Sequence, residues 1–163
     1  RWMVPVVILA ALLAWIMPGP LILYNDTPSL SEGIYYRAWQ APETGSIIAI
    51  TPRAGAVETI RAAGIDIPPV RLLKPIAASA GDHVCRTAEG VAINGREIRL
   101  PVMSERGGKA LPSWQECRTL AAGELFVIAL RHPRSFDSRY FGPIRVGDVL
   151  GVYRPLLNEE LPR

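Results

Sequence analysis

Prolines and glycines break this chain into short apolar runs. Fifteen prolines and 14 glycines occur among its 163 residues, of which 49% are hydrophobic. Proline removes a backbone donor and glycine favours turns, so interruptions this frequent favour short strands over long helices. The apolar content is sufficient for the core of one domain of ordinary size. We therefore expect a mainly β domain with one or two short helices.

Several segments have the β-branched and aromatic composition of strands. The first two in the chain are expected to pair as a hairpin, and Asn94-Gly95 marks the tight turn of another. The most apolar segment, 124–130, is expected at the centre of the sheet, and a short helix is expected over 56–63. The predicted strands are 34–39, 46–51, 70–76, 124–130 and 146–153, and residues 91–98 are the predicted hairpin with its turn at Asn94-Gly95.

The beginning of the chain is its only long apolar run. No charged side chain occurs from Trp2 to Tyr24, and Pro18 and Pro20 are expected to end a helix near Met17. Such a helix would rise roughly 24 Å, slightly less than the thickness of a bilayer core. A cleavable signal peptide, a membrane anchor and a buried core helix are all compatible with this run.

The flanks of the apolar run favour the membrane anchor. No small-x-small cleavage pattern follows it, and Arg1 precedes it. The tendency of basic residues to stay in the cytoplasm would place the rest of the chain on the other side of the membrane. We expect residues 1–23 to be a transmembrane anchor and residues 24–163 to be a separate domain outside the cytoplasm.

The charge pattern disfavours nucleic-acid binding. The formal net charge is only +3, and the basic residues are scattered without a Lys/Arg block or an interleaved aromatic platform. An anionic membrane surface would suit this charge better.

Cys85 and Cys117 are the only cysteines. In a domain outside the cytoplasm such a pair is expected to form a disulfide, which would close a loop of about 33 residues and contribute roughly 3 to 4 kcal/mol. A metal site is not expected, because these two separated cysteines and the distant His83 and His132 lack the paired ligand spacing of zinc sites. No cofactor is expected.

A bend directly after the apolar run contains a candidate nucleophile. Ser29 follows Pro28, whose ring fixes φ, and precedes Gly33, which permits a sharp turn. A bend of this kind would present the serine hydroxyl outward. Turn residues at the exit of a membrane segment have the same composition, so this stretch alone does not establish a function.

Lys74 interrupts an apolar face. In a strand, alternate residues share a face, so Leu72, Lys74 and Ile76 are expected to point the same way. An inward lysine can blunt an edge strand, or pack its stem while its ammonium stays in water. It can also be desolvated between apolar neighbours, which lowers its pKa and makes the neutral amine available as a general base.

Three motifs follow one another along the chain: Thr27-Pro28-Ser29 with Gly33 and Tyr35, Leu73-Lys74 with Gly81-Asp82, and Asp137-Ser138-Arg139-Tyr140-Phe141-Gly142. In this order they resemble the bacterial type I signal peptidases, and most closely those that serve conjugative transfer. The resemblance extends from about Asn25 to Tyr153 and includes the cysteine pair. The sequence departs from the family pattern at Ser31, where proline is expected, and at Pro75 and Ala80, where arginine and proline are usual.

The resemblance implies a signal-peptidase-like (LexA-like) β-sheet catalytic domain with a serine-lysine dyad. Ser29 would be the nucleophile and Lys74 the general base that takes its proton. The Ser29 backbone N–H and the Thr27 hydroxyl would form the oxyanion hole. No histidine is required for this chemistry.

The resemblance also implies supporting roles for three residues further along the chain. Ser135 falls where a hydroxyl orients the lysine amine, and Asp137 with Arg139 would hold that loop in place. A carboxylate and a guanidinium two residues apart can also pair merely to fix a loop. Gly142 would leave room for a close backbone approach.

The function implied by the resemblance is that of a membrane-anchored serine endopeptidase in the periplasm, at the outer face of the bacterial inner membrane. Its substrate would be an exported preprotein, most specifically a conjugative pilin precursor whose maturation can end in cyclisation. Inner-membrane lipid and the conjugative transfer (type IV secretion) machinery would be its partners. The alternatives are a general type I signal peptidase that removes leader peptides, and a non-enzymatic assembly scaffold of a conjugation apparatus.

Overall fold

The computed structural model describes residues 19–51, 71–106 and 108–157. These residues fold mainly into antiparallel β-structure, in a seven-stranded sheet, a four-stranded sheet and a two-stranded pair. Helical structure in this part of the chain is limited to α3 (Ser138–Phe141) and the 3-10 turn η1 (Val146–Asp148). The expected mainly β class is confirmed, whereas the helix expected over 56–63 lies outside the described residues.

The seven-stranded sheet contains strands from both ends of the described chain. Its order is β1-β2-β13-β3-β4-β11-β12, so β13 lies between β2 and β3. The expected hairpin of the first two predicted strands is therefore wrong. β13 pairs antiparallel with β2 on one side and with β3 on the other, and its Val152 and Tyr153 side chains are buried. The strands are β1 (Ile22–Asn25), β2 (Gly33–Ala38), β3 (Ile47–Ile50), β4 (Leu72–Ser79), β11 (Glu124–Val127), β12 (Ile144–Arg145) and β13 (Val149–Pro155).

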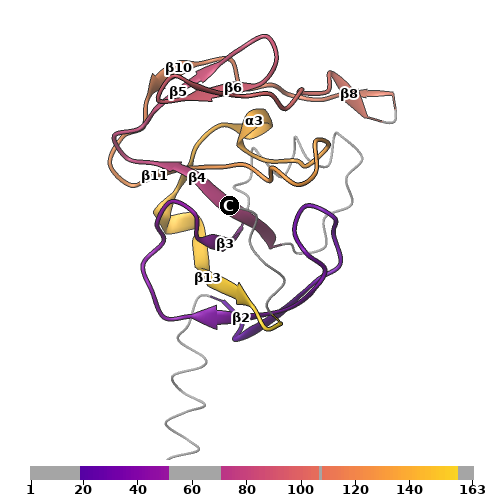
Figure 1. Ribbon diagram of the computed structural model, residues 1–163, viewed down its shortest axis with the longest axis vertical. Helices are drawn as coiled ribbons and strands as arrows, with labels where there is room; N and C mark the ends of the chain where they lie inside the picture. Colours follow the sequence, from indigo (N-terminus) through magenta and orange to yellow (C-terminus); the bar gives the residue numbers. More distant parts are fainter. Residues whose placement is uncertain (1–18, 52–70, 107, 158–163) are drawn as a thin grey trace, which may run out of the picture.

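The four-stranded sheet lies at the opposite end of the molecule from β1 and β2 (Figure 1). The hairpin turn expected at Asn94-Gly95 is present, with positive φ angles of 50° and 81° at these two residues. The segment that follows β7 contains the short pair β8 (Glu105–Arg106) and β9 (Lys109–Ala110). The four strands are β5 (His83–Arg86), β6 (Val91–Ile93), β7 (Arg96–Ile98) and β10 (Cys117–Thr119).

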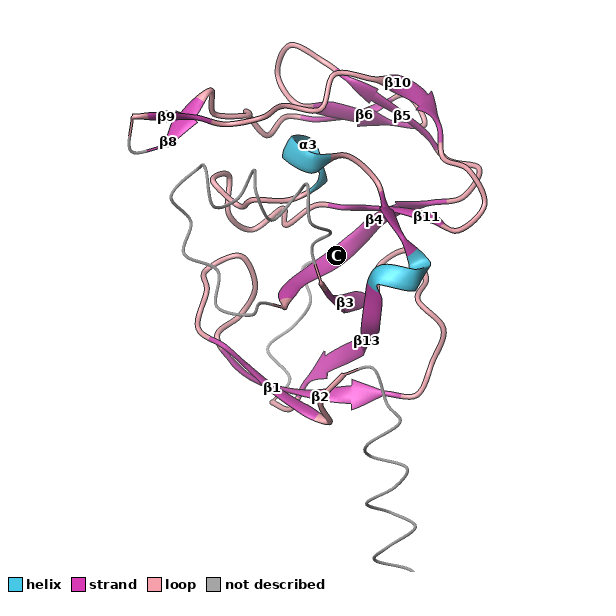
Figure 2. Cartoon of the chain, turned by 180° about the vertical axis from the view of Figure 1, so that it is seen from behind, coloured by secondary structure: helices cyan, strands magenta, loops and turns pink. Residues whose placement is uncertain are grey.

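The most apolar strand, β11, does not lie at the centre of its sheet. Only the two-residue strand β12 lies beyond it. Its burial has another cause, because Phe126 packs in a cluster with Val84 and Val91 from the four-stranded sheet. Figure 2 shows this sheet above β4 and β11, with α3 between the two layers.

The disulfide Cys85–Cys117 is formed, as expected. The two residues are direct partners in the antiparallel pair β5–β10, which places their side chains on one face. The bond ties the edge strand β10 to its neighbour.

The expected anchor, residues 1–23, lies mostly outside the described residues. Its last two residues, Ile22 and Leu23, belong to β1 of the large sheet. Within the described ranges, no helix has the length and apolar character needed to cross a bilayer.

Candidate active site

Ser29 lies in the loop between β1 and β2 and is 6% exposed. Its Oγ lies 3.0 Å from the Oγ1 of Thr27, within hydrogen-bond distance. The Thr27 hydroxyl in turn donates to Oδ1 of Asn25 at 2.7 Å. The two hydroxyls that the sequence assigned to a nucleophile and an oxyanion hole therefore lie next to each other.

Asn25 shapes this loop, a role that the sequence analysis did not assign. It is the last residue of β1 and is 6% exposed. Its Nδ2 donates to the backbone oxygens of Thr27 and Ser31, at 3.0 and 3.1 Å. Its Oδ1 accepts from the Thr27 backbone N–H as well as from the hydroxyl. An asparagine at the end of a strand, just before turn residues, is the sequence signal for such a side-chain-stabilised turn.

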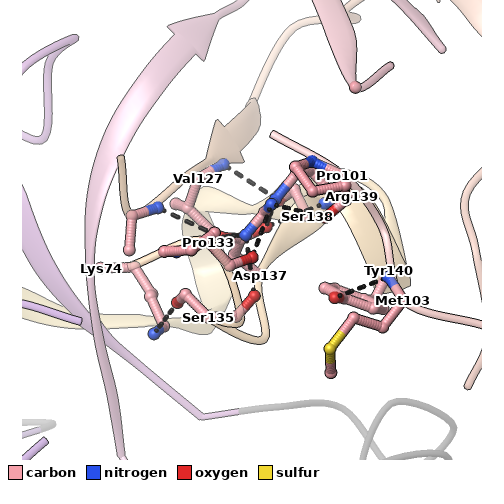
Figure 3. Close-up of polar contacts among 12 residues, drawn as sticks. Lys74, Pro101, Met103, Val127, Pro133, Ser135, Asp137, Ser138, Arg139 and Tyr140 are labelled. Carbon is pink, nitrogen blue, oxygen red and sulfur yellow. Dashed lines mark hydrogen bonds and ion pairs between the residues drawn. The ribbon is translucent and has the colours of Figure 1, made fainter. Parts of the chain in front are cut away.

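Lys74 lies in β4 and is only 5% exposed. Leu72, which shares its strand face, packs against Phe136 and Tyr140, so Lys74 also points toward the segment after β11. Burial lowers the pKa of Lys74 to about 8; the nearby Asp137 opposes this change and Arg139 reinforces it. Its Nζ donates to Oγ of Ser135 at 2.7 Å (Figure 3).

Asp137 and Arg139 form a fully buried ion pair beside this contact. Each is 0% exposed, and the guanidinium donates through Nε and Nη2 to the two carboxylate oxygens at 2.8 and 2.9 Å. Arg139 also donates to the backbone oxygens of Pro133 and Ser135, at 3.1 and 2.9 Å. The pair therefore holds the loop that presents Ser135 to Lys74 (Figure 3).

The short helix α3 is fixed at both ends. Asp137 caps its N-terminus by accepting from the Arg139 backbone N–H, and Ser138 accepts from the backbone N–H of Val127 at 3.0 Å. Gly142 ends the helix with φ of 76°, and a Cβ at this position would lie 2.8 Å from the ring of Trp114. Gly142 thus permits both the backbone conformation and the close approach of Trp114.

A hydrogen bond joins the Ser29 loop to the chain segment that leads to Ser135. Arg131 donates through Nη1 to Oγ of Ser31 at 2.8 Å, although the two residues are 100 positions apart. Among the described residues, no hydrogen bond joins Ser29 Oγ to Lys74 Nζ directly. The hydroxyl is held by Thr27 and the amine by Ser135.

An apolar groove opens beside Ser29. Its volume is about 370 Å³, and its walls come from the β1–β2 loop, from β4 after Lys74 and from the segment that follows β11. A groove of this size accommodates a short extended segment of another chain. The residues that line it include Ser29, Leu30, Tyr35, Ile47, Ile128 and Leu130.

His83 lies closer to the cysteines than its place in the sequence suggests. Its Nε2 lies 3.3 Å from Sγ of Cys85 and 3.5 Å from Sγ of Cys117. The expectation of a distant histidine is therefore wrong. These three side chains have the donor types of a metal site, but both sulfurs are bonded to each other and are not available as thiolate ligands. His132 is not part of this group.

The comparisons with known proteins agree with the sequence motifs. The sequence model of the family "Signal peptidase, peptidase S26" matches residues 1–157. Two Escherichia coli proteins named plasmid transfer protein TraF are 30% and 27% identical over 143 residues, which is 82% of this chain and 81% and 80% of theirs. A crystal structure of a signal peptidase I from Enterococcus faecalis V583 aligns with a TM-score of 0.41 and 21% identity, over 71% of this chain and 98% of that chain.

The family assignment rests on the extent of these matches. The family model covers nearly the whole chain, and the first TraF relative is similar over four fifths of both sequences. The chain therefore belongs to the signal peptidase family, peptidase S26, whose members are serine peptidases that process exported precursors.

Proposed function

We propose that this chain is a membrane-anchored serine endopeptidase in which Ser29 is the nucleophile and Lys74 is the general base. The observation that carries the proposal is the burial of Lys74 beside a serine hydroxyl. No carboxylate in the described part of the chain forms an ion pair with its amine, which is 5% exposed and donates to Ser135. A lysine in such surroundings is poorly suited to a structural salt bridge and well suited to act as a base.

The lowered pKa makes the base available at neutral pH. With a pKa of about 8, about 10% of Lys74 is uncharged at pH 7. An ordinary lysine, with a pKa of 10.5, would be uncharged in only about 0.03% of molecules. Burial therefore raises the fraction of active base by a factor of about 300.

The proposed reaction begins with attack by Ser29. Its hydroxyl proton passes to the neutral Lys74 Nζ while Oγ bonds to the scissile carbonyl carbon, and the oxyanion accepts from the Ser29 N–H and the Thr27 hydroxyl. The Lys74 ammonium then protonates the leaving amine, which leaves an acyl-enzyme on Ser29. Ser135 orients the amine throughout, because the neutral amine donates one N–H to it and keeps its lone pair for the Ser29 proton.

The acyl-enzyme is resolved by a second nucleophile. Water attacks the ester carbonyl with Lys74 again taking the proton, which releases a free carboxyl terminus and regenerates Ser29. Attack by the amino terminus of the bound precursor would instead form a peptide bond and release a cyclic product. The same two residues serve both routes.

The outer face of the β1–β2 hairpin supports a location at the membrane. Ile22 lies opposite Tyr36 and Tyr24 opposite Ile34, and these four side chains are 40% to 70% exposed. Trp39, the residue directly after β2, is 74% exposed. Exposed aliphatic and aromatic side chains gathered on one face are typical of surfaces that contact lipid headgroups. The disulfide is consistent with the oxidising periplasm.

We propose a conjugative pilin precursor as the substrate. Support comes from the relatives named plasmid transfer protein, which match this chain over about four fifths of its length. The transfer machinery in the same membrane would then be the partner of the enzyme.

Processing of two substrates tests this function. The full chain is incubated in membranes with a pilin precursor and, separately, with an ordinary secretory preprotein. We expect cleavage of the pilin precursor, complete loss of cleavage in Ser29→Ala and Lys74→Met, and normal cleavage in the control Ser113→Ala, whose residue lies in the loop before β10.

Two other results would contradict the proposal. Cleavage of the secretory preprotein at a comparable rate would identify a general signal peptidase. Unchanged precursor maturation in cells that carry Ser29→Ala would favour a non-enzymatic scaffold.

A further inference from the structure

Among the described residues, one charged side chain lines the groove beside Ser29. Arg131 is exposed, and it lies on the groove wall together with Ser31, whose hydroxyl accepts its hydrogen bond at 2.8 Å. The other described residues that line the groove are uncharged. The described lining therefore presents a single positive charge to a bound segment.

The Arg131 guanidinium has N–H donors that its hydrogen bond to Ser31 does not use. Of its five N–H groups, Ser31 uses one. No described carboxylate pairs with Arg131, and its side chain is exposed where it lines the groove. An apolar wall around such a group strengthens its interaction with an anion, and the planar fork of arginine matches a carboxylate.

Ser31 fixes the position of this charge. A proline at this position would have no hydroxyl to accept the Arg131 hydrogen bond.

We propose that Arg131 makes the groove selective for a carboxylate in the bound substrate. This inference rests on the proposed function and adds a substrate feature to it. The Cα atoms of residues 29 and 31 are at most about 7 Å apart, and an extended segment rises about 3.3 Å per residue. The selected carboxylate therefore lies within about two or three residues of the scissile bond.

Binding of labelled peptides to the full chain in detergent tests the selection. Alanine-rich peptides carry one glutamate, moved from position to position, and matched peptides carry glutamine instead. Fluorescence anisotropy with the Ser29→Ala protein, which does not consume the peptides, gives each dissociation constant. We expect glutamate to bind about tenfold more tightly than glutamine at one position, and the preference to weaken as salt is raised from 0.05 to 0.5 M.

Substitutions on this background assign the preference to Arg131. Arg131→Gln is expected to remove the preference for glutamate, and Arg131→Glu to replace it by a preference for lysine. Ser31→Pro is expected to weaken the preference for glutamate without removing it. Arg96→Gln is the matched control, because Arg96 is exposed on β7 and does not line the groove; it should retain the tenfold preference.

Several results would overturn the proposal. Equal binding of glutamate and glutamine peptides at every position would do so without any variant, and so would a preference that persists in Arg131→Gln. Peptides with free and amidated carboxyl termini distinguish an acidic side chain from a terminal carboxylate, and a difference at either source supports the proposal. Cleavage of the same peptides by the active protein is scored separately, so a failure of the proposed peptidase activity is not confused with a failure of selection.

Discussion

Lys74 Nζ and Ser135 Oγ lie 2.7 Å apart in the core of the molecule, although the two residues are 61 positions apart in the chain. Both are at most 5% exposed. The contact joins the middle of β4 to a loop that a buried ion pair holds rigid.

Loss of the Ser135 hydroxyl is expected to impair catalysis more than stability. Without this acceptor, the charged form of Lys74 loses a hydrogen bond, so its pKa falls and the amine is less well oriented. We expect Ser135→Ala to lower kcat by about tenfold to a hundredfold and to shift the acidic limb of the pH–rate profile to lower pH. Ser113→Ala, at a half-buried position in the loop before β10, should change neither kcat nor the acidic limb. An unchanged kcat in Ser135→Ala would contradict this positioning role.

Stability should depend on pH through Lys74. Its pKa is about 8 in the folded protein and 10.5 when exposed, so the unfolded chain binds more protons between these values. The free energy of unfolding is therefore expected to rise as the pH increases from about 8 to about 10.5. Below pH 8 the buried charge costs roughly 3 kcal/mol.

Chemical denaturation of a matched pair measures this effect. Lys74→Met, which has no ionisable amine, should be more stable than the wild type at pH 7, and the difference should shrink as the pH is raised. A constant difference across this range would show that Lys74 is not desolvated in the folded protein.

Disruption of the buried Asp137–Arg139 ion pair should lower the stability of the fold substantially. Asp137→Asn leaves the fully buried Arg139 without its countercharge, and we expect a loss of about 3 to 5 kcal/mol in unfolding free energy. Since Asp137 raises the pKa of Lys74, the acidic limb of activity in the surviving folded protein should also move to lower pH. Arg99→Ala is the control, because its ion pairs are exposed and should contribute at most about 1 kcal/mol. Equal losses in the two variants would refute the distinction.

The disulfide should contribute to stability and not to catalysis. Cys85→Ser with Cys117→Ser is expected to lower the unfolding free energy by about 3 to 4 kcal/mol, because it reopens a loop in the unfolded chain. The four-stranded sheet does not line the groove, so kcat/KM at 25 °C should stay within about twofold. Denaturation and peptide cleavage on the same samples check both expectations. A large loss of kcat/KM with stability intact would link this sheet to the substrate.

Local patterns predicted the positions of the candidate residues. The alternation of Leu72, Lys74 and Ile76 predicted an inward lysine, and Asn94-Gly95 predicted a hairpin turn. Both signals are local, because each depends only on residues close together in the sequence. The mainly β class followed in the same way from the spacing of prolines and glycines.

Contacts between distant segments were not predictable from these patterns. β13 pairs with β2 and β3 from about 100 positions away or more, and Arg131 contacts Ser31 over a similar separation. His83 approaches the cysteines because β5 and β10 pair, which the sequence does not reveal. Strand β1 was missed because its residues continue the apolar run that had been assigned to the anchor.

The pH dependence of kcat/KM for one cleavable precursor peptide tests the central claim most directly. If neutral Lys74 activates Ser29, the rate should rise about tenfold per pH unit below an inflexion near pH 8 and level off above it. A profile that is flat from pH 6 to 9, or an inflexion near 6.5 that His132→Gln removes, would contradict a lysine base.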